Sequence, residues 1–135
     1  MSKEIYNKKG RYDNPVIIDA GEEGDYFWII ISLGGWPCAY VGIKVGHPLF
    51  AMNYDEIYEK GIELDVHGGI TYTDTEVIGL SLQRWWIGWD YAHSGDYSQY
   101  RLEHYSEGKK WTVPEIKEDI KEIIKQLRKE ADEKL

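Results

Sequence analysis

The sequence has little of what secreted or membrane-spanning proteins depend on. Its 135 residues contain one cysteine, Cys38, so no disulfide can form within the chain. The longest apolar run, YFWIIISL at 26–33, is much shorter than the roughly 20 residues that a transmembrane helix needs. The N-terminal segment MSKEIYNKKG has no apolar region typical of a secretory signal. We therefore expect a cytoplasmic protein that does not enter the membrane.

Signatures of common catalytic sites are also missing. The sequence contains no HExxH or paired CxxC motif, no EF-hand loop, no GxSxG, no GxGxxG and no P-loop. These absences disfavour a standard metal site, an α/β-hydrolase and a standard dinucleotide or triphosphate site. Cys38 follows Pro37 beside an apolar segment, so we expect it to be a small core residue and not a nucleophile.

Positive charge is scarce, since 16 basic residues stand against 24 acidic ones for a formal net charge of −8. A negative chain repels nucleic-acid phosphates unless its basic residues cluster, so double-stranded DNA is not an expected partner. A small anionic ligand stays compatible with this charge, because a few local donors are enough to bind it.

Aromatic residues are abundant but unevenly chosen, with eleven Tyr and six Trp beside only two Phe. Tyr and Trp carry a polar tip on an apolar body, which suits half-wet surfaces and binding sites. Aromatic residues also favour strands for packing reasons alone. Composition leaves both interpretations open.

The hydrophobic pattern predicts a single α+β domain over residues 1–135. We expect an antiparallel sheet of about five strands, a short helix and a long C-terminal amphipathic helix packed on one face. No βαβ pattern occurs, which disfavours a Rossmann-type fold. The predicted strands are 15–20, 26–33, 38–45, 62–73 and 84–91, with 77–82 as a weaker strand or connector, and the predicted helices are 53–61 and 112–135.

The C-terminal helix has the clearest signals. Thr112 and Glu115 have capping-box spacing, and Pro114 falls in the first turn, where its missing N–H costs little. Isoleucines and leucines recur at helical spacing from 116 to 127 and form one apolar stripe. The stripe predicts a helix that covers the sheet, or alternatively one that forms a homodimer.

Three histidines lie beside glycine, in turns or at strand ends, and two have aspartates close in sequence. The segments are GHP around His47, DVHGG around His67 and DYAHSGD around His93. Glycine lets a backbone approach a ligand closely, and aspartate can fix a histidine tautomer or share a metal. His104 lacks this context, so we expect it at the surface.

These residues support three interpretations. His67, His93, Asp90 and Asp96 could act as catalytic acid and base, or hold a divalent metal, for which the signal is weak. Alternatively they could form the polar wall of a ligand site, together with His47 and Asp65. In the third interpretation, they only hydrogen-bond turn backbones.

The segment RWWIGWDY splits into two faces if it is extended. Trp85, Ile87 and Trp89 are expected in the core under the C-terminal helix. Trp86 would face the other way beside Gly88, whose missing side chain would leave a slot for a planar ligand. Further candidates are Tyr91 for stacking, Trp36 and Trp111 for the rim, and Arg84, Arg101 and Lys44 for an anionic group.

Three separated blocks resemble a family of small phage and prophage proteins. The blocks are CAYVGIKVGHPL at 38–49, DVHGGIT at 65–71 and WWIGWDYAHSGD at 85–96. The resemblance implies that the histidines and aspartates of these blocks belong to the family motif, but it does not imply an activity. Phage proteins of this size often act against host immunity, some by sequestering or destroying nucleotide signals.

The expected function is therefore a phage-type counter-defence protein that binds and sequesters a nucleotide-like ligand, such as a cyclic nucleotide or an ADP-ribose signal. The alternatives are a phosphodiesterase-like hydrolase of such a ligand and an inhibitor that binds a host defence protein.

Overall fold

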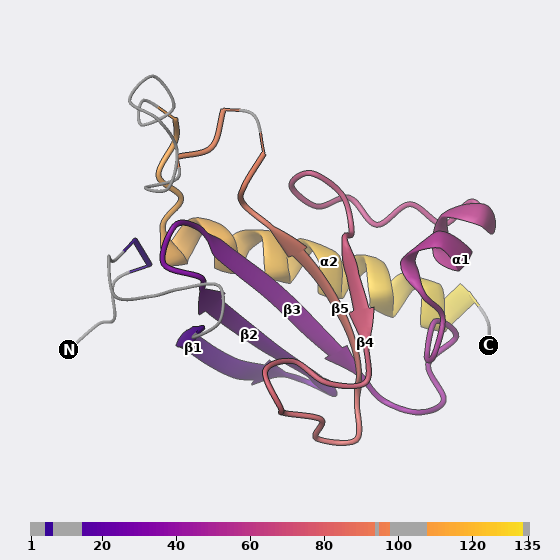
Figure 1. Ribbon diagram of the computed structural model, residues 1–135. Helices are drawn as coiled ribbons and strands as arrows, with labels where there is room; N and C mark the ends of the chain where they lie inside the picture. The colour runs from indigo at the N-terminus through magenta and orange to yellow at the C-terminus, as the bar shows by residue number, and fades with distance from the viewer. Residues whose placement is uncertain (1–4, 7–14, 94, 98–107, 134–135) are drawn as a thin grey trace.

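One antiparallel sheet and one long helix form the two main layers of the protein (Figure 1). The structure is a computed structural model that describes residues 5–6, 15–93, 95–97 and 108–133. The five strands lie in the order β1-β2-β3-β5-β4, and every neighbouring pair is antiparallel. The predicted α+β fold is confirmed. The elements are β1 (Val16–Glu23), β2 (Tyr26–Ser32), β3 (Pro37–Ile43), α1 (Tyr54–Glu59), β4 (Tyr72–Asp74), β5 (Trp85–Asp90) and α2 (Val113–Glu133).

The central strands are apolar on both faces because both faces of the sheet are covered. β3 is buried along its whole length, and most of β2 and β5 is buried too. The β2–β3 hairpin turns through residues 33–36, where Leu33 N–H donates to the Trp36 carbonyl at 3.0 Å. This explains why YFWIIIS and PCAYVGI lack the alternation of half-exposed strands.

The first face packs against α2. Ile116, Ile120, Ile123, Ile124 and Leu127 are all buried, in one core with the Trp89 row of β5. The helix begins as predicted, because Glu115 N–H donates to Thr112 Oγ1 and Glu115 Oε1 accepts from Thr112 N–H. The apolar stripe that also suggested a dimer helix is thus used within the chain.

The second face has its own, smaller core, which includes Tyr40, Trp86 and Val77. Residues 75–84 fold over part of this face after β4. Val77 and Leu80 each donate a backbone N–H to the other's carbonyl, at 3.0 and 2.8 Å. Of the two predictions for 77–82, a weaker strand or a connector, the connector is correct, since Val77 to Leu80 form a tight turn.

The predicted strand at 62–73 is wrong except at its end, since only Tyr72–Asp74 is a strand. Gly68 and Gly69 take φ values of 71° and 81°, which a strand ladder does not accept. The Asp65 N–H donates instead to the Gln126 side chain, and the Ile70 N–H donates to the Tyr58 hydroxyl. The apolar alternation still has a packing role: Ile62, Leu64 and Val66 belong to the α2-side core.

Within the described residues, no helix is both long and apolar enough to cross a membrane.

Candidate functional site

Asp96 is the centre of a histidine–aspartate cluster that comprises His67, Asp90, His93 and Asp96. Its carboxylate is buried, and Oδ2 lies 2.7 Å from His67 Nε2. The same oxygen accepts from the His93 backbone N–H at 2.9 Å, while Oδ1 accepts from Trp111 Nε1 at 2.8 Å. One carboxylate thereby joins three segments that are distant in sequence.

These hydrogen bonds also determine the charge state of Asp96. Burial alone would raise the pKa of this carboxyl, but the hydrogen bonds from His67, the His93 N–H and Trp111 lower the pKa below its ordinary value overall. Asp96 is therefore a carboxylate at neutral pH, and its hydrogen bond to Nε2 orients the His67 ring.

His93 forms the second histidine–aspartate pair. Its Nε2 lies 3.2 Å from Asp90 Oδ1, and its side chain is 35% exposed. The ring packs against the backbone of Gly68 so closely that a Cβ there would lie 2.1 Å from Nε2. The two histidine rings are edge to face, with centroids 5.6 Å apart. Gly68, the first glycine of DVHGG, is thus required because the His93 ring lies so close to its backbone.

Aromatic rings fix the position of His67. Tyr91 stacks on it with centroids 5.0 Å apart and an interplanar angle of 7°, and Trp111 lies at 4.7 Å. Tyr91 in turn donates its hydroxyl proton to Asp119 of α2 at 2.6 Å and accepts from Trp89 Nε1 at 3.0 Å. Tyr91 was a candidate for stacking on a ligand, but it is fully buried and its ring stacks on that of His67 instead.

Three further residues that were predicted to bind ligand, His47, Asp65 and Arg84, lie outside this cluster. His47 donates from Nε2 to the Leu127 carbonyl and accepts the Leu49 N–H at Nδ1. Burial lowers its pKa, so the neutral ring serves to tie residues 46–50 to α2. Leu127 lies eight residues after Asp119, the residue that Tyr91 contacts, which is about 12 Å along a helix. His47 is therefore bound to a different part of α2 from Tyr91.

Asp65 and Arg84 make contacts of their own elsewhere. Asp65 is exposed, and its backbone N–H donates to Gln126. Arg84 donates to the Asp25 carbonyl and lies over the Phe27 ring at 4.5 Å. Arg101 and His104 fall outside the described residues.

Trp86 needs a correction. It does face away from α2, as predicted, but it is fully buried and donates from Nε1 to the Ser81 carbonyl at 3.0 Å. The slot expected beside Gly88 is filled by Tyr40, whose ring would lie 2.3 Å from a Cβ at that position. The alternation identified the correct face but could not show that the chain itself covers it.

Among the described residues, no three His, Cys, Asp or Glu side chains are grouped so that they could hold a metal ion.

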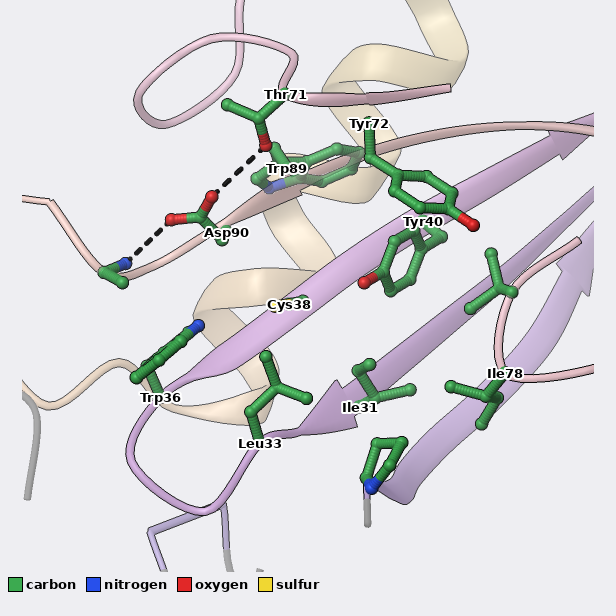
Figure 2. Close-up of a pocket in the computed structure, with 13 residues that line it drawn as sticks. Ile31, Leu33, Trp36, Cys38, Tyr40, Thr71, Tyr72, Ile78, Trp89 and Asp90 are labelled. Carbon is green, nitrogen blue, oxygen red and sulfur yellow. Dashed lines mark hydrogen bonds between the residues drawn. The ribbon is translucent and has the colours of Figure 1, made fainter. Parts of the chain in front are cut away.

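A cavity on the second face was not predicted from the sequence. Its volume is about 510 Å³, and it opens between β2, β3, β4 and the turn at 77–80 (Figure 2). We call it the aromatic cavity. The residues that line it are Pro15, Ile31, Leu33, Trp36, Cys38, Tyr40, Thr71, Tyr72, Val77, Ile78, Trp89, Asp90 and Ala92.

The aromatic cavity and the histidine–aspartate cluster share Asp90. Its Oδ2 accepts from Thr71 Oγ1 at 3.2 Å at the wall of the cavity (Figure 2). Its Oδ1 accepts from the Ala92 N–H at 3.1 Å and faces His93. A ligand that reaches Asp90 from the cavity therefore touches the residue that positions His93.

Ile78 is held at the cavity wall at a local cost. Ile78 and Gly79 have φ values of 44° and 83°, the pattern of a type I′ turn that favours Asn, Asp or Gly. A β-branched residue at positive φ is strained by roughly 1–3 kcal/mol. The Ile78 side chain nevertheless lines the cavity and is 40% exposed.

Cys38 also faces the cavity but is not a nucleophile in this setting. Burial raises the pKa of its thiol to about 12, with the Asp90 charge as a further cause. The expectation of an unreactive, buried cysteine agrees with this environment.

No protein-family model, curated protein or solved structure matches this chain. The structure therefore defines the class only as an α+β protein with a helix on one sheet face and an aromatic cavity on the other.

Proposed function

We propose that the protein binds and sequesters a small nucleotide-like ligand in the aromatic cavity. The observation that carries this proposal is a cavity of about 510 Å³ with Trp36, Tyr40 and Tyr72 among its walls and the carboxylate of Asp90 at one end. Small-molecule sites typically measure roughly 300–1,000 Å³ and combine apolar walls with a few polar groups. Stacking of a base on an aromatic ring contributes about 1–3 kcal/mol.

The biological part of the proposal is counter-defence, in which the bound ligand is a host immune signal such as a cyclic nucleotide or an ADP-ribose derivative. Its support is the sequence resemblance to phage proteins, and the location it implies is the host cytoplasm. Sequestration needs only a cavity with sufficient affinity, and no step of this function requires a nucleophile or a metal.

Isothermal titration of the whole protein against nucleosides, cyclic nucleotides and ADP-ribose isomers tests the proposal. Ile78→Asn is the sharpest variant, because it shortens one wall while it suits the type I′ turn better. We expect it to weaken binding by about tenfold, or 1.4 kcal/mol, without a loss of thermal stability. Val45→Asn is the control, since Val45 is 78% exposed and is not among the residues that line the cavity. No heat with any compound would refute the proposal.

A hydrolase is the second candidate, and the two histidine–aspartate pairs beside the cavity favour it. The His67 and His93 side chains are 25% and 35% exposed, so solvent reaches part of each ring, while His93 Nε2 itself is buried and faces Asp90. Incubation of a bound ligand with the protein, with and without Mg²⁺, Mn²⁺ or Zn²⁺, separates the two functions. Products that disappear in His93→Ala indicate an enzyme, whereas intact ligand recovered after denaturation indicates sequestration.

A further inference from the structure

We propose that the aromatic cavity takes the uncharged base or nucleoside part of its ligand and leaves phosphate groups outside. The inference rests on the ligand-binding function proposed above and concerns which part of the ligand is recognised. Its basis is the charge and hydrogen-bonding character of the cavity walls.

The charge of the walls is negative. Among the described residues that line the cavity, none is Lys, Arg or His, and the one ionisable carboxyl is Asp90. A phosphate placed beside this carboxylate would be repelled, and the net charge of −8 adds to the repulsion.

Three basic side chains in the described part of the chain that could offset this charge, Lys44, Arg84 and Lys109, are engaged elsewhere. Lys44 pairs with Asp25 at 2.9 Å, and Arg84 donates to the carbonyl of the same residue. Arg84 precedes β5 and Asp90 ends it, so the two are separated by about 20 Å along the strand. Lys109, near the cluster, pairs with Glu115 at 2.7 Å. Arg84 and Lys44, which were expected to bind an anion, therefore lie near the opposite end of β5 from Asp90, the charged group of the cavity.

The polar atoms at the Asp90 end mostly accept hydrogen bonds. A carboxylate has about four acceptor positions. Those of Asp90 receive Thr71 Oγ1 and the Ala92 N–H, with His93 Nε2 close by. The remaining capacity of Asp90, together with the lone pairs of Thr71 Oγ1, suits a ligand that brings N–H or O–H donors. Amino-bearing bases and ribose hydroxyls meet this requirement, and phosphate oxygens do not.

The test compares matched ligands that differ only in phosphate. Adenosine, guanosine and cytidine, their 5′-monophosphates and their 3′,5′-cyclic monophosphates are titrated into the wild-type protein at low and high salt. We expect at least one nucleoside to bind as tightly as its phosphorylated forms or more tightly, with an affinity that salt does not weaken. Asp90→Asn, which keeps an acceptor oxygen but removes the charge, should improve the affinity for a monophosphate relative to its nucleoside by about threefold or more. Asp65→Asn, at an exposed carboxylate, is the matched control.

The failure of this inference is distinguishable from failure of the proposed function. A monophosphate or cyclic monophosphate that binds more tightly than its nucleoside in every series overturns the inference and leaves the function standing. The absence of binding by all nine compounds and by ADP-ribose overturns both.

Discussion

Gly68 is the residue at which the backbone and the histidine–aspartate cluster meet. Its φ of 71° favours glycine, and its missing side chain admits the His93 ring. Gly61 offers a comparison, because it has a similar φ of 76° but no atom within 4 Å of the position that a Cβ would take. The two positions therefore separate the backbone cost of a substitution from the steric cost.

We expect Gly68→Ala to destabilise the protein clearly more than Gly61→Ala. Both variants force alanine into the left-handed region, at a cost of about 1–2 kcal/mol. Gly68→Ala must also displace His93 and disturb its approach to Asp90. Urea unfolding measures both losses, and equal values for the two variants would contradict the close packing of His93 on Gly68.

At the scale of elements, the Tyr91 hydroxyl links the sheet to α2. Tyr91 follows directly after β5, and its hydroxyl accepts from Trp89 Nε1 and donates to Asp119 in the second turn of the helix. Because Tyr91 and Trp89 are both buried, water cannot take the place of the hydroxyl as the partner of the Trp89 Nε1–H.

Tyr91→Phe should therefore lower the free energy of unfolding by about 1–3 kcal/mol, since it leaves the buried Trp89 Nε1–H and the half-buried Asp119 carboxylate without their partner. Tyr72→Phe is the matched variant, because the Tyr72 hydroxyl donates to the carbonyl of exposed Glu76, which water can reach. Thermal and urea unfolding of the two variants provide the comparison. A loss for Tyr91→Phe no larger than for Tyr72→Phe would refute the role of this hydroxyl in joining the two layers.

At the scale of the whole molecule, the Asp96 side chain connects three segments of the chain. Its carboxylate holds His67 of the loop before β4, the His93 backbone after β5 and Trp111 just before α2. The stability of the molecule should consequently depend on the charge of this carboxylate.

The direction of the pH dependence follows from the pKa of Asp96, which is lower in the folded protein than its ordinary value. The unfolded chain then takes up the proton first as the pH falls. The stabilisation is complete above the ordinary pKa of about 3.9 and is lost as the pH drops through the lower folded value. We expect the stability gap between wild type and Asp96→Asn to be large at pH 7 and to shrink below about pH 4.

Urea unfolding at several pH values between 3 and 7 measures this gap. Asp132→Asn, at an exposed residue of α2, gives the baseline for removal of a carboxylate. A gap for Asp96→Asn that stays constant across this range would rule out the ionised carboxylate as the stabilising group.

The local pattern of the sequence by itself determined the elements and the direction of their faces. The β-branched and aromatic runs at 26–33 and 84–91, and the isoleucine stripe of 116–127, specify period and burial, which depend only on near neighbours along the chain. The same alternation correctly placed Trp85, Ile87 and Trp89 toward α2. It failed at 62–71, where glycine φ values and side-chain partners for the backbone end the strand.

Only the tertiary structure decided which side chains meet. The structure brings His67, His93, Asp90 and Asp96 together, and their pairing is nested along the chain, with Asp90 on His93 inside the longer-range pair of Asp96 on His67. The aromatic cavity draws its walls from residues as far apart as Pro15 and Ala92, and Tyr40 fills the slot expected at Trp86. Sequence periodicity reports the face of an element, but a cavity is the space left after several faces pack together, so it exists only once the sheet order and the covering turn are set.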